Sequence, residues 1–199
     1  MTVTGPRGEY AKTPARRHEI LSAAVEVFSA AGYHKGSLRD VAERVGLSQA
    51  GVLHHFPSKH HLIEAVLAWR DDESRRRFRA GASGLATIRD LVDLVDYNQN
   101  TPQLIELYAT LSAEATTPDH PLHDYFVKRY ADVVAFVQNS LEHAAAVGDL
   151  RPDVDPAPAA RCVLALMDGL QIQWLYDRDS VDMAAQVRHY VQSLLAVEL

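Results

Sequence analysis

The sequence predicts an all-α protein of about nine helices, in which a three-helix N-terminal domain precedes a larger helical domain. Apolar residues recur at the three- and four-residue spacing of amphipathic helices along the whole chain, and no alternating Val-, Ile- or Thr-rich segment predicts a strand. Charge also divides the chain, since residues 1–61 contain eight Lys and Arg against five Asp and Glu, whereas the remainder contains 12 against 21. This asymmetry favours a front part that binds a polyanion.

Composition is that of a globular protein with a sizeable core. The chain has 199 residues, 47% of them hydrophobic and 23% charged. Its single cysteine, Cys162, excludes an internal disulfide. The apolar runs are far shorter than the roughly 20 residues of a membrane span, and residues 1–12 lack the apolar centre of a signal peptide. We therefore expect a cytoplasmic protein without a membrane partner.

The first helix has clear start and stop signals. Residues 1–12 are expected to form a flexible arm. Thr13 is suited to cap the helix and Pro14 to occupy its first position, where a missing N–H is not needed. An apolar stripe follows over residues 20–31. Gly32 then ends the helix, because it accepts a positive φ without steric cost.

Two short helices are predicted at 38–45 and 49–56. Ser37 is suited to cap the first and Ser48 the second, and Gly46 permits a sharp reversal between them. A short turn with a glycine between two short helices is typical of the helix-turn-helix motif. That motif lays its second helix in the major groove of DNA.

The second short helix has a composition that suits a binding surface more than a core. Ala50 and Gly51 are small and allow close approach to base edges, while Gln49 is able to make paired hydrogen bonds with adenine. Lys59 starts the next helix, whose N-terminus favours a phosphate. These features predict a DNA-binding domain over residues 13–58, with double-stranded DNA as its partner.

Residues 59–199 are expected to form a second helical domain. Its apolar stripes keep the helical spacing, and Pro, Gly and Asp separate them. The predicted helices span residues 59–79, 86–98, 102–116, 121–147, 156–177 and 180–197.

The stretch from Ser37 to Ser48 (SLRDVAERVGLS), followed by Val52 to Lys59 (VLHHFPSK), resembles the DNA-binding signature of the TetR family of bacterial transcriptional regulators. The resemblance covers residues 14–67, and residues 106–122 are similar to C-terminal domains of actinobacterial members. It implies a homodimeric regulator, of the repressor kind, that binds a palindromic operator and is released by a small-molecule effector. Leu53 departs from the pattern, because the family commonly has a tyrosine there whose hydroxyl holds a phosphate. Carried over by position, the DNA contacts fall on Ser37, Arg39, Ser48, Gln49, Ala50, His54, His55 and Lys59.

The back domain is the expected place for an effector and for a second copy of the chain. Its aromatic residues suit either a core or a pocket, and buried polar residues among them need partners that a ligand is able to supply. A mostly apolar pocket favours a hydrophobic or amphipathic effector. The candidate ligand-binding residues are Tyr108, Leu111, Phe126, Tyr130, Gln171 and Trp174. The last two helices carry the longest apolar stripes, which pairing with a copy would bury. The candidate dimer-interface residues are Val163, Met167, Leu170, Val187, Val191 and Leu194.

Other function classes find little support in the sequence. It has no Gly-rich phosphate loop, no nucleophile elbow and no paired catalytic motif, so no enzyme and no cofactor is expected. His120 and His123 have the spacing of a metal-binding pair, but no third ligand accompanies them; capping or surface roles are favoured and no metal is expected. The alternative is an all-helical small-molecule-binding or catalytic protein without DNA affinity.

Overall fold

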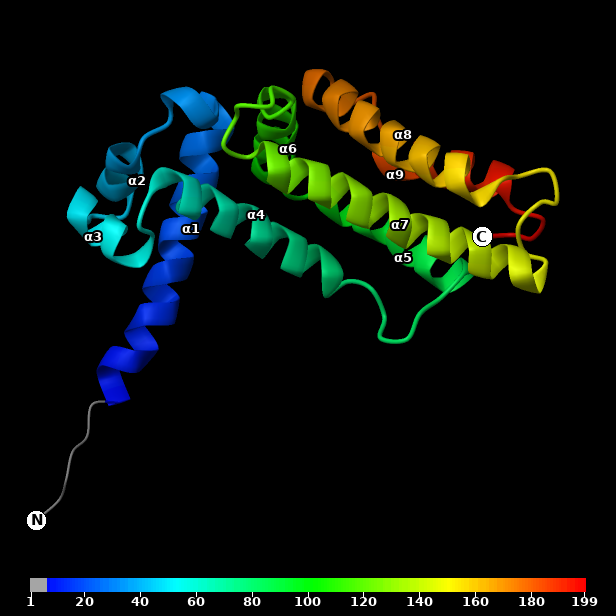
Figure 1. Cartoon of the computed structure of the whole chain (residues 1–199), viewed down its shortest axis with the longest axis horizontal. Helices are drawn as coiled ribbons and strands as arrows, with labels where there is room; N and C mark the ends of the chain where they lie inside the picture. Colours follow the sequence, from blue (N-terminus) through cyan, green and yellow to red (C-terminus); the bar gives the residue numbers. More distant parts are fainter. Residues whose placement is uncertain (1–6) are drawn as a thin grey trace, which may run out of the picture. The chain divides into compact units, whose positions relative to one another are not determined.

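A computed structural model describes residues 7–199, and their side chains from Pro14 onward. Within this range the chain is helical and contains no strand, which confirms the predicted fold class (Figure 1). The helices are α1 (Arg7–Lys35), α2 (Leu38–Arg44), α3 (Gln49–His55), α4 (Lys59–Arg75), α5 (Leu85–Asn98), α6 (Pro102–Glu114), α7 (His123–Val147), α8 (Pro156–Tyr176) and α9 (Met183–Leu194).

The largest difference from prediction is at the start of α1. The helix begins at Arg7, so Pro14 lies inside it, and only residues 1–6 of the expected arm lie outside the described residues. Proline removes one backbone hydrogen bond from a helix, and flanking turns are able to carry the helix past that loss. Gly32 behaves as predicted, since its φ of 67° and ψ of −176° interrupt the helix before Lys35.

Several other helix ends also differ from the prediction, by at most four residues. Helix α4 ends at Arg75, four residues before the predicted end, because Arg79 turns back and donates hydrogen bonds to the buried carboxylate of Asp90. Helix α9 begins at Met183 because the Asp182 side chain accepts a hydrogen bond from the backbone N–H of Ala185 at 2.9 Å.

The chain forms two compact units, which we call the N-terminal unit (residues up to Trp69) and the C-terminal unit (Arg70–Leu199). The N-terminal unit buries one face each of α1, α2 and α3 and the start of α4. Its most deeply buried side chains include Ile20, Phe28, Val41, Val52, Phe56, Leu62 and Leu67.

Side-chain caps define α2 and α3 as the sequence predicts. The Ser37 hydroxyl accepts a hydrogen bond from the backbone N–H of Asp40, whose carboxylate accepts one in return from the N–H of Ser37, both at 3.2 Å. The Ser48 hydroxyl accepts from the N–H of Gly51 at 3.1 Å. Between the helices, Gly46 has a φ of 66°, a conformation that glycine adopts without strain.

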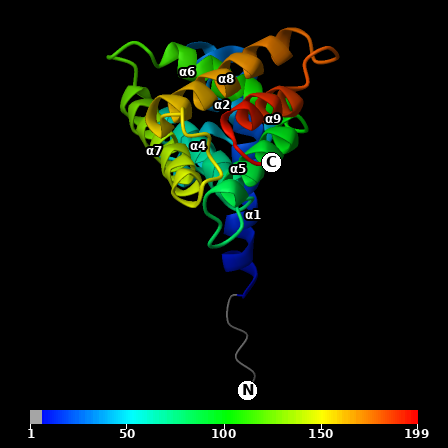
Figure 2. The same cartoon turned by 90° about the vertical axis from the view of Figure 1, so that its right-hand side faces the viewer.

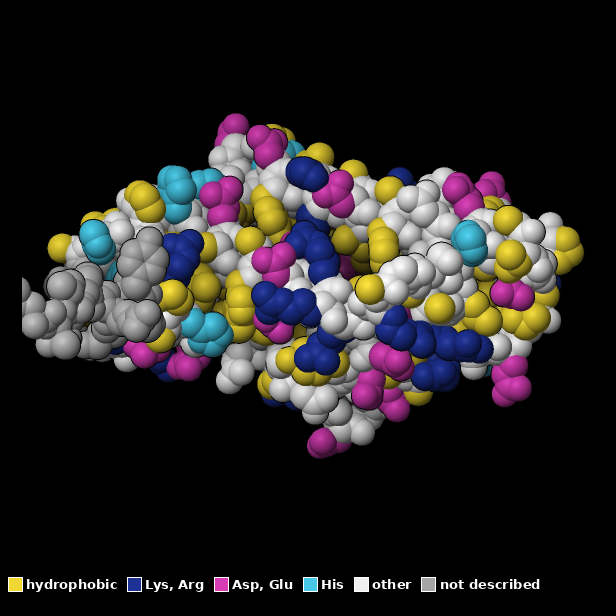
Figure 3. Space-filling view, turned by 90° about the horizontal axis from the view of Figure 1, so that it is seen from below, with side chains coloured by type: hydrophobic (Ala, Val, Ile, Leu, Met, Phe, Trp, Pro, Cys, Tyr) yellow, Lys and Arg dark blue, Asp and Glu magenta, His cyan; other side chains and the backbone are white. Residues whose placement is uncertain are grey.

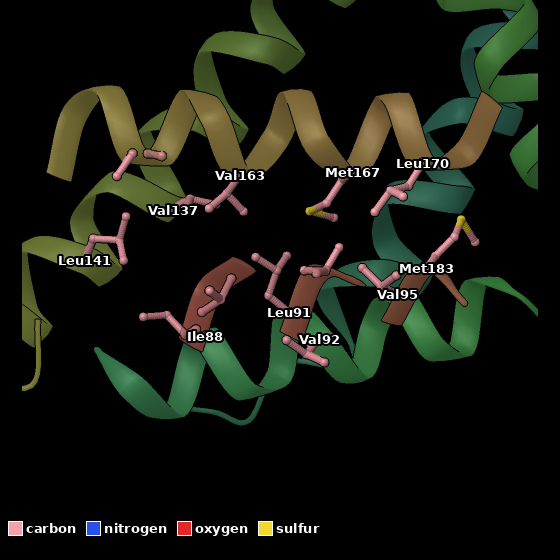
Figure 4. Close-up of a cluster of buried hydrophobic side chains, with 14 of the residues drawn as sticks. Ile88, Leu91, Val92, Val95, Val137, Leu141, Val163, Met167, Leu170 and Met183 are labelled. Carbon is pink, nitrogen blue, oxygen red and sulfur yellow. The ribbon is translucent and has the colours of Figure 1, made fainter. Parts of the chain in front are cut away.

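In the C-terminal unit, α7 packs along α8, and α9 packs against both α5 and α8 (Figures 1 and 2). Side chains from these four helices form one hydrophobic core, part of which is shown in Figure 4. Gly148 ends α7 in the left-handed conformation, and the Asp155 side chain caps α8. None of the helices in the described range is long and apolar enough to cross a lipid bilayer.

The residues predicted to pair two copies of the chain lie in or beside this core. Val163, Met167, Leu170, Val187 and Val191 are all at most 9% exposed, and Leu194 packs partly buried against the same cluster. They are covered within the chain, where α7 packs against α8, α5 packs against α9, and α8 and α9 pack against each other. How two copies pair stays a prediction.

Candidate nucleic-acid interface and buried polar cluster

Helix α3 has one anchored face and one exposed face. Val52 and Phe56 are at most 1% exposed and fix the helix in the core of the N-terminal unit. Gln49, Ala50 and His54 are exposed on the outer side. Leu53, where the TetR pattern commonly has tyrosine, is also exposed, at 37%. The exposed face is short, polar and small enough to enter a major groove.

Contacts from α1 hold both short helices in place. The Arg17 guanidinium donates a hydrogen bond to the backbone carbonyl of His55 at 3.0 Å and lies 4.1 Å from the centre of the Phe56 ring. Arg16 donates to the carbonyl of Val45 at 3.4 Å. The C-terminal ends of α2 and α3 are thereby tied to one rigid element, which orients the exposed face of α3.

Lys59 has a structural role that sequence reasoning missed. Its ammonium nitrogen donates hydrogen bonds to the backbone carbonyls of Tyr33, at 2.6 Å, Gly36, at 3.1 Å, and His34, at 3.4 Å. It also lies 4.7 Å from the centre of the Tyr33 ring. The charge predicted to meet a phosphate thus holds the segment between α1 and α2.

The other predicted DNA-contact residues lie around α2 and α3. Arg39 is exposed and forms a 2.9 Å ion pair with Glu43 one turn along α2. Ser37 and Ser48 cap the two helices. His55 is partly buried, and that burial, followed by the positive charge of His54, lowers its pKa. All of these residues belong to the N-terminal unit.

The C-terminal unit contains a partly buried group of charged and phenolic side chains, which we call the polar cluster. It consists of Arg70, Asp71, Tyr108, Tyr125, Arg129, Tyr130 and Asp168. These residues come from α4, α6, α7 and α8. Such a cluster requires close partners, since unpaired charge is unfavourable in a protein interior.

Asp71 is the best-connected member of the polar cluster. Its carboxylate accepts hydrogen bonds from Arg129 Nε at 3.0 Å, from the Tyr125 hydroxyl at 2.6 Å and from Arg70 Nη1 at 3.3 Å. Arg129 also donates to the Tyr108 hydroxyl at 2.9 Å. Two cations therefore share one carboxylate.

The two arginines respond differently to burial. Burial, followed by the positive charge of Arg129, lowers the pKa of Arg70. Burial acts in the same direction on Arg129, but attraction to Tyr108 and Asp71 outweighs it and raises the pKa of Arg129. Asp168 accepts a hydrogen bond from the Tyr130 hydroxyl at 2.9 Å, and its burial raises its pKa. The buried charge of Arg129 is thus well compensated by its neighbours, whereas the charge of Arg70 is compensated less well.

The predicted ligand residues fall partly in this cluster and partly in the core. Tyr108 and Tyr130 belong to the cluster, and Phe126 lies beside Tyr108 with ring centres 5.5 Å apart. Leu111, Gln171 and Trp174 are buried. Gln171 lines a cavity of about 10 Å³ with Val95, Asn98, Met167, Leu170, Met183 and Val187, which is room for one water.

The charged members of the polar cluster were not predicted from sequence, although a signal exists. Arg70 lies seven residues after Ile63, Arg129 three after Phe126, and Asp168 four after Leu164, so each is in phase with the buried stripe of its helix. The two histidines considered as a metal-binding pair make local backbone contacts: His120 Nδ1 accepts from the N–H of Leu122, and His123 Nδ1 donates to the carbonyl of Ala115.

A small helix-turn-helix unit followed by a helical unit with a buried polar cluster defines a DNA-binding regulator class. Residues 20–66 match the bacterial regulatory proteins of the tetR family, and residues 85–196 match the C-terminal domain of BetI-type transcriptional repressors. The chain belongs to the TetR family of helix-turn-helix transcriptional regulators.

Individual relatives agree with this assignment. The HTH-type transcriptional regulator UidR of Escherichia coli is 27% identical over 91% of this chain and 90% of its own. The HTH-type transcriptional repressor Rv1474c of Mycobacterium tuberculosis is 28% identical over 86% and 88%. A solved structure of a TetR-family regulator from Rhodococcus covers 91% of this chain and 98% of its own, with a TM-score of 0.72 and 26% identity. Another, described as the molecular basis for control of antibiotic production by bacterial hormones, covers 90% and 97%, with a TM-score of 0.70 and 31% identity.

Proposed function

We propose that this regulator represses transcription by binding a two-fold symmetric operator as a homodimer, and that a small molecule bound in its C-terminal unit releases it. The observation that carries the DNA-binding part is the geometry of α3. Val52 and Phe56 anchor the helix, while Gln49, Ala50 and His54 face outward. The relative Rv1474c, which is named a transcriptional repressor, supports repression rather than activation of transcription.

Sequence is read by the exposed face of α3 in this proposal. Gln49 contacts a base edge, and Ala50 and Gly51 let the helix backbone approach. Arg39 and the capping serines contact phosphates, which fixes the register of the unit on DNA. Positive charge supplied by Arg16, Arg17, Arg39 and Arg44 attracts DNA without regard to sequence.

The homodimer uses the outward face of α8. Residues at helical spacing along this face are small or apolar: Ala165, Gly169, Ile172 and Tyr176. Ile172 is 51% exposed and Tyr176 is 90% exposed. Nothing lies within 4 Å of a Cβ built on Gly169, so the face permits close approach of another helix. Two-fold pairing places the same face of both copies in contact and presents two α3 helices to two half-sites.

The effector is bound in the C-terminal unit. The polar cluster supports this, because its members have the mixture of aromatic surface and directional polar groups that small-molecule sites use. The relative whose structure is described in terms of bacterial hormones supports a small effector as well. The ligand-free repressor, which senses nothing, is the simpler variant of the same proposal.

A gel-shift experiment with DNA from upstream of its own gene tests the proposal. The wild type should bind, and Gln49→Ala combined with His54→Ala should not, because both side chains lie on the exposed face of α3. Gln103→Ala, an exposed glutamine in the C-terminal unit, is the matched control and should bind as the wild type does. Equal loss for both variants, or no binding by the wild type to any fragment of its genomic neighbourhood, favours the alternative of a helical small-molecule-binding protein.

A further inference from the structure

Arg70 stands out within the polar cluster because it is buried without sufficient partners. It is 9% exposed, and it donates one hydrogen bond, of 3.3 Å, to Asp71. Its guanidinium donates no other hydrogen bond within the part of the chain whose side chains are described, from Pro14 onward. A guanidinium carries five N–H donors in a planar fork, so most of its hydrogen-bonding capacity is unused.

The carboxylates nearby do not supply what Arg70 lacks. Asp71 is already engaged by Arg129 and the Tyr125 hydroxyl. Asp168 accepts from Tyr130 and forms no ion pair with either arginine in the described part of the chain. Instead, both guanidinium carbons lie over the Tyr108 ring, at 4.2 Å for Arg70 and 4.7 Å for Arg129. The polar cluster thus contains two arginines and two aspartates, but only Asp71 accepts hydrogen bonds from the arginines.

We propose that Arg70 is the anchor for a negatively charged group of the effector, and that this group is a carboxylate. The inference rests on the proposed effector-released regulator and names the chemical class of its ligand. The planar fork of a guanidinium matches a carboxylate in a two-bond arrangement. Asp71 accepts one hydrogen bond from Arg70, and the remaining N–H donors of this guanidinium are able to bind both oxygens of one carboxylate.

Aromatic side chains around Arg70 suit the same ligand. The Tyr108 hydroxyl accepts a hydrogen bond from Arg129 at 2.9 Å, and its ring lies against both guanidinium groups. Phe126, beside Tyr108, offers apolar surface to the rest of the molecule. The effector is therefore an organic acid with an apolar portion, in keeping with the amphipathic effector expected from the sequence.

Binding of such a ligand requires the C-terminal unit to open. Arg70, Asp71, Tyr108 and Arg129 contact one another directly, and the cavity of about 10 Å³ beside Gln171 is lined by none of them, so an organic acid reaches Arg70 only if these side chains move apart. A ligand that binds only an opened form shifts the population toward that form. Because Arg70 and Asp71 lie on α4, the helix that starts at Lys59 in the N-terminal unit, the same opening provides a path from ligand to DNA. On the face shown in Figure 3, Lys and Arg side chains lie close to Asp and Glu side chains, with hydrophobic side chains beside them.

The first test needs no ligand and uses the purified full-length protein. Arg70→Met removes an uncompensated buried charge and fills the space with an apolar chain, so the melting temperature should stay equal or rise. Arg129→Met should lower the melting temperature, because it breaks the bonds to Asp71 and Tyr108. An equal loss of stability in both variants would show that Arg70 is a structural residue and would overturn the proposal.

The second test uses matched pairs of probes, namely benzoate, phenylacetate and decanoate, each beside its primary amide. The carboxylates should raise the melting temperature of the wild type and the amides should not. Arg70→Met should weaken binding of the best carboxylate at least tenfold, whereas Arg75→Gln, an exposed arginine on the same helix, should leave it unchanged. Equal effects of acids and amides, a full response in Arg70→Met, or no response to any acid would contradict the proposal. Operator binding by the wild type in a gel shift remains a separate measurement, so failure of the anion site and failure of the regulator are distinguishable.

Discussion

The ammonium nitrogen of Lys59 lies 2.6 Å from the carbonyl oxygen of Tyr33, so the first residue of α4 holds the segment that leads from α1 into α2. The same nitrogen also donates to the carbonyls of His34 and Gly36. An ammonium group has three donors, and three carbonyls occupy them. The position of α2, and with it the helix-turn-helix, depends on this one side chain.

Lys59→Met should therefore lower the stability of the protein as well as its DNA affinity. Loss of a hydrogen-bonded charge leaves carbonyl groups without a donor, and the expected cost is about 1–3 kcal/mol of unfolding free energy. Denaturant unfolding measures it, and a gel shift should show weaker binding to all sequences alike. If Lys59 contacted only a phosphate, the stability of Lys59→Met would equal that of the wild type, and the salt dependence of its DNA binding would fall by about one ion per half-site.

Gln49→Ala should change which sequences are bound more than how tightly DNA in general is bound. A glutamine that reads an adenine in two hydrogen bonds contributes roughly 1–3 kcal/mol of discrimination at one base pair per half-site. Stability should not change, because Gln49 is exposed. Affinity for a set of operators that differ at single base pairs measures the effect. Arg39→Ala is the contrasting variant. Its DNA binding should depend less on salt concentration, and its order of preference among the operators should be unchanged.

Gly36→Ala should destabilise the N-terminal unit. A Cβ built on Gly36 lies 2.4 Å and 2.7 Å from two carbons of the Phe28 ring, which is 1% exposed and has no room to move. Overpacking of this kind costs about 1–3 kcal/mol, measurable by thermal unfolding. Gly51→Ala is the matched control, since its Cβ would have ordinary contacts of 3.5 Å inside α3. Similar melting temperatures for the two variants would contradict this account.

Local signals explain which parts of the structure were predictable. The caps at Ser37 and Ser48 and the turn at Gly46 depend on residues within one helical turn, and the structure confirms them. The predicted start of α1 was wrong, because a proline is compatible with either the first position or an interior position of a helix, and Pro14 occupies an interior one. The polar cluster depends on side chains 21 to 58 residues apart, such as Tyr108, Arg129 and Asp71, and only the fold brings them together.

Periodicity alone does not distinguish a stripe buried in the core from a stripe that contacts another copy of the chain. The stripe that includes Val163, Met167 and Leu170 is apolar enough for either role, and its spacing does not identify its partner. In the structure, α7 and α9 pack against α8 and these side chains are buried, whereas the face with Gly169 is left outward.

Stability should fall in acid as Asp90 becomes protonated. Burial alone raises the pKa of Asp90. The backbone N–H and the guanidinium of Arg79 both donate hydrogen bonds to its carboxylate, and these bonds, together with the positive charge of Arg79, hold the pKa of Asp90 below its ordinary value. The carboxylate therefore stabilises the folded state fully above the unfolded pKa of about 3.9, and this contribution is lost as the pH falls through the lower folded pKa. Asp90→Asn should be less stable than the wild type at pH 7, with a smaller difference at pH 3. Asp96→Asn, exposed on the same helix, should show neither effect.

Ile172→Arg should separate the proposed dimer without disturbing the fold of the subunit. Ile172 is 51% exposed on the outward face of α8, so a charge there is solvated in a monomer but buried without a partner in a two-fold interface. Val127→Arg is the matched control, because Val127 is 57% exposed on α7 and lies outside the proposed face. Light scattering at micromolar concentration should give a dimer for the wild type and for Val127→Arg, and a monomer for Ile172→Arg.

The helical circular dichroism of all three proteins should be the same, and the melting temperature should depend on protein concentration only in the two dimeric proteins. Operator affinity should fall sharply in Ile172→Arg alone, since two half-sites then have to be bound independently. A monomeric wild type would contradict the proposed homodimer, and an Ile172→Arg protein that remains dimeric would place the interface elsewhere than on this face.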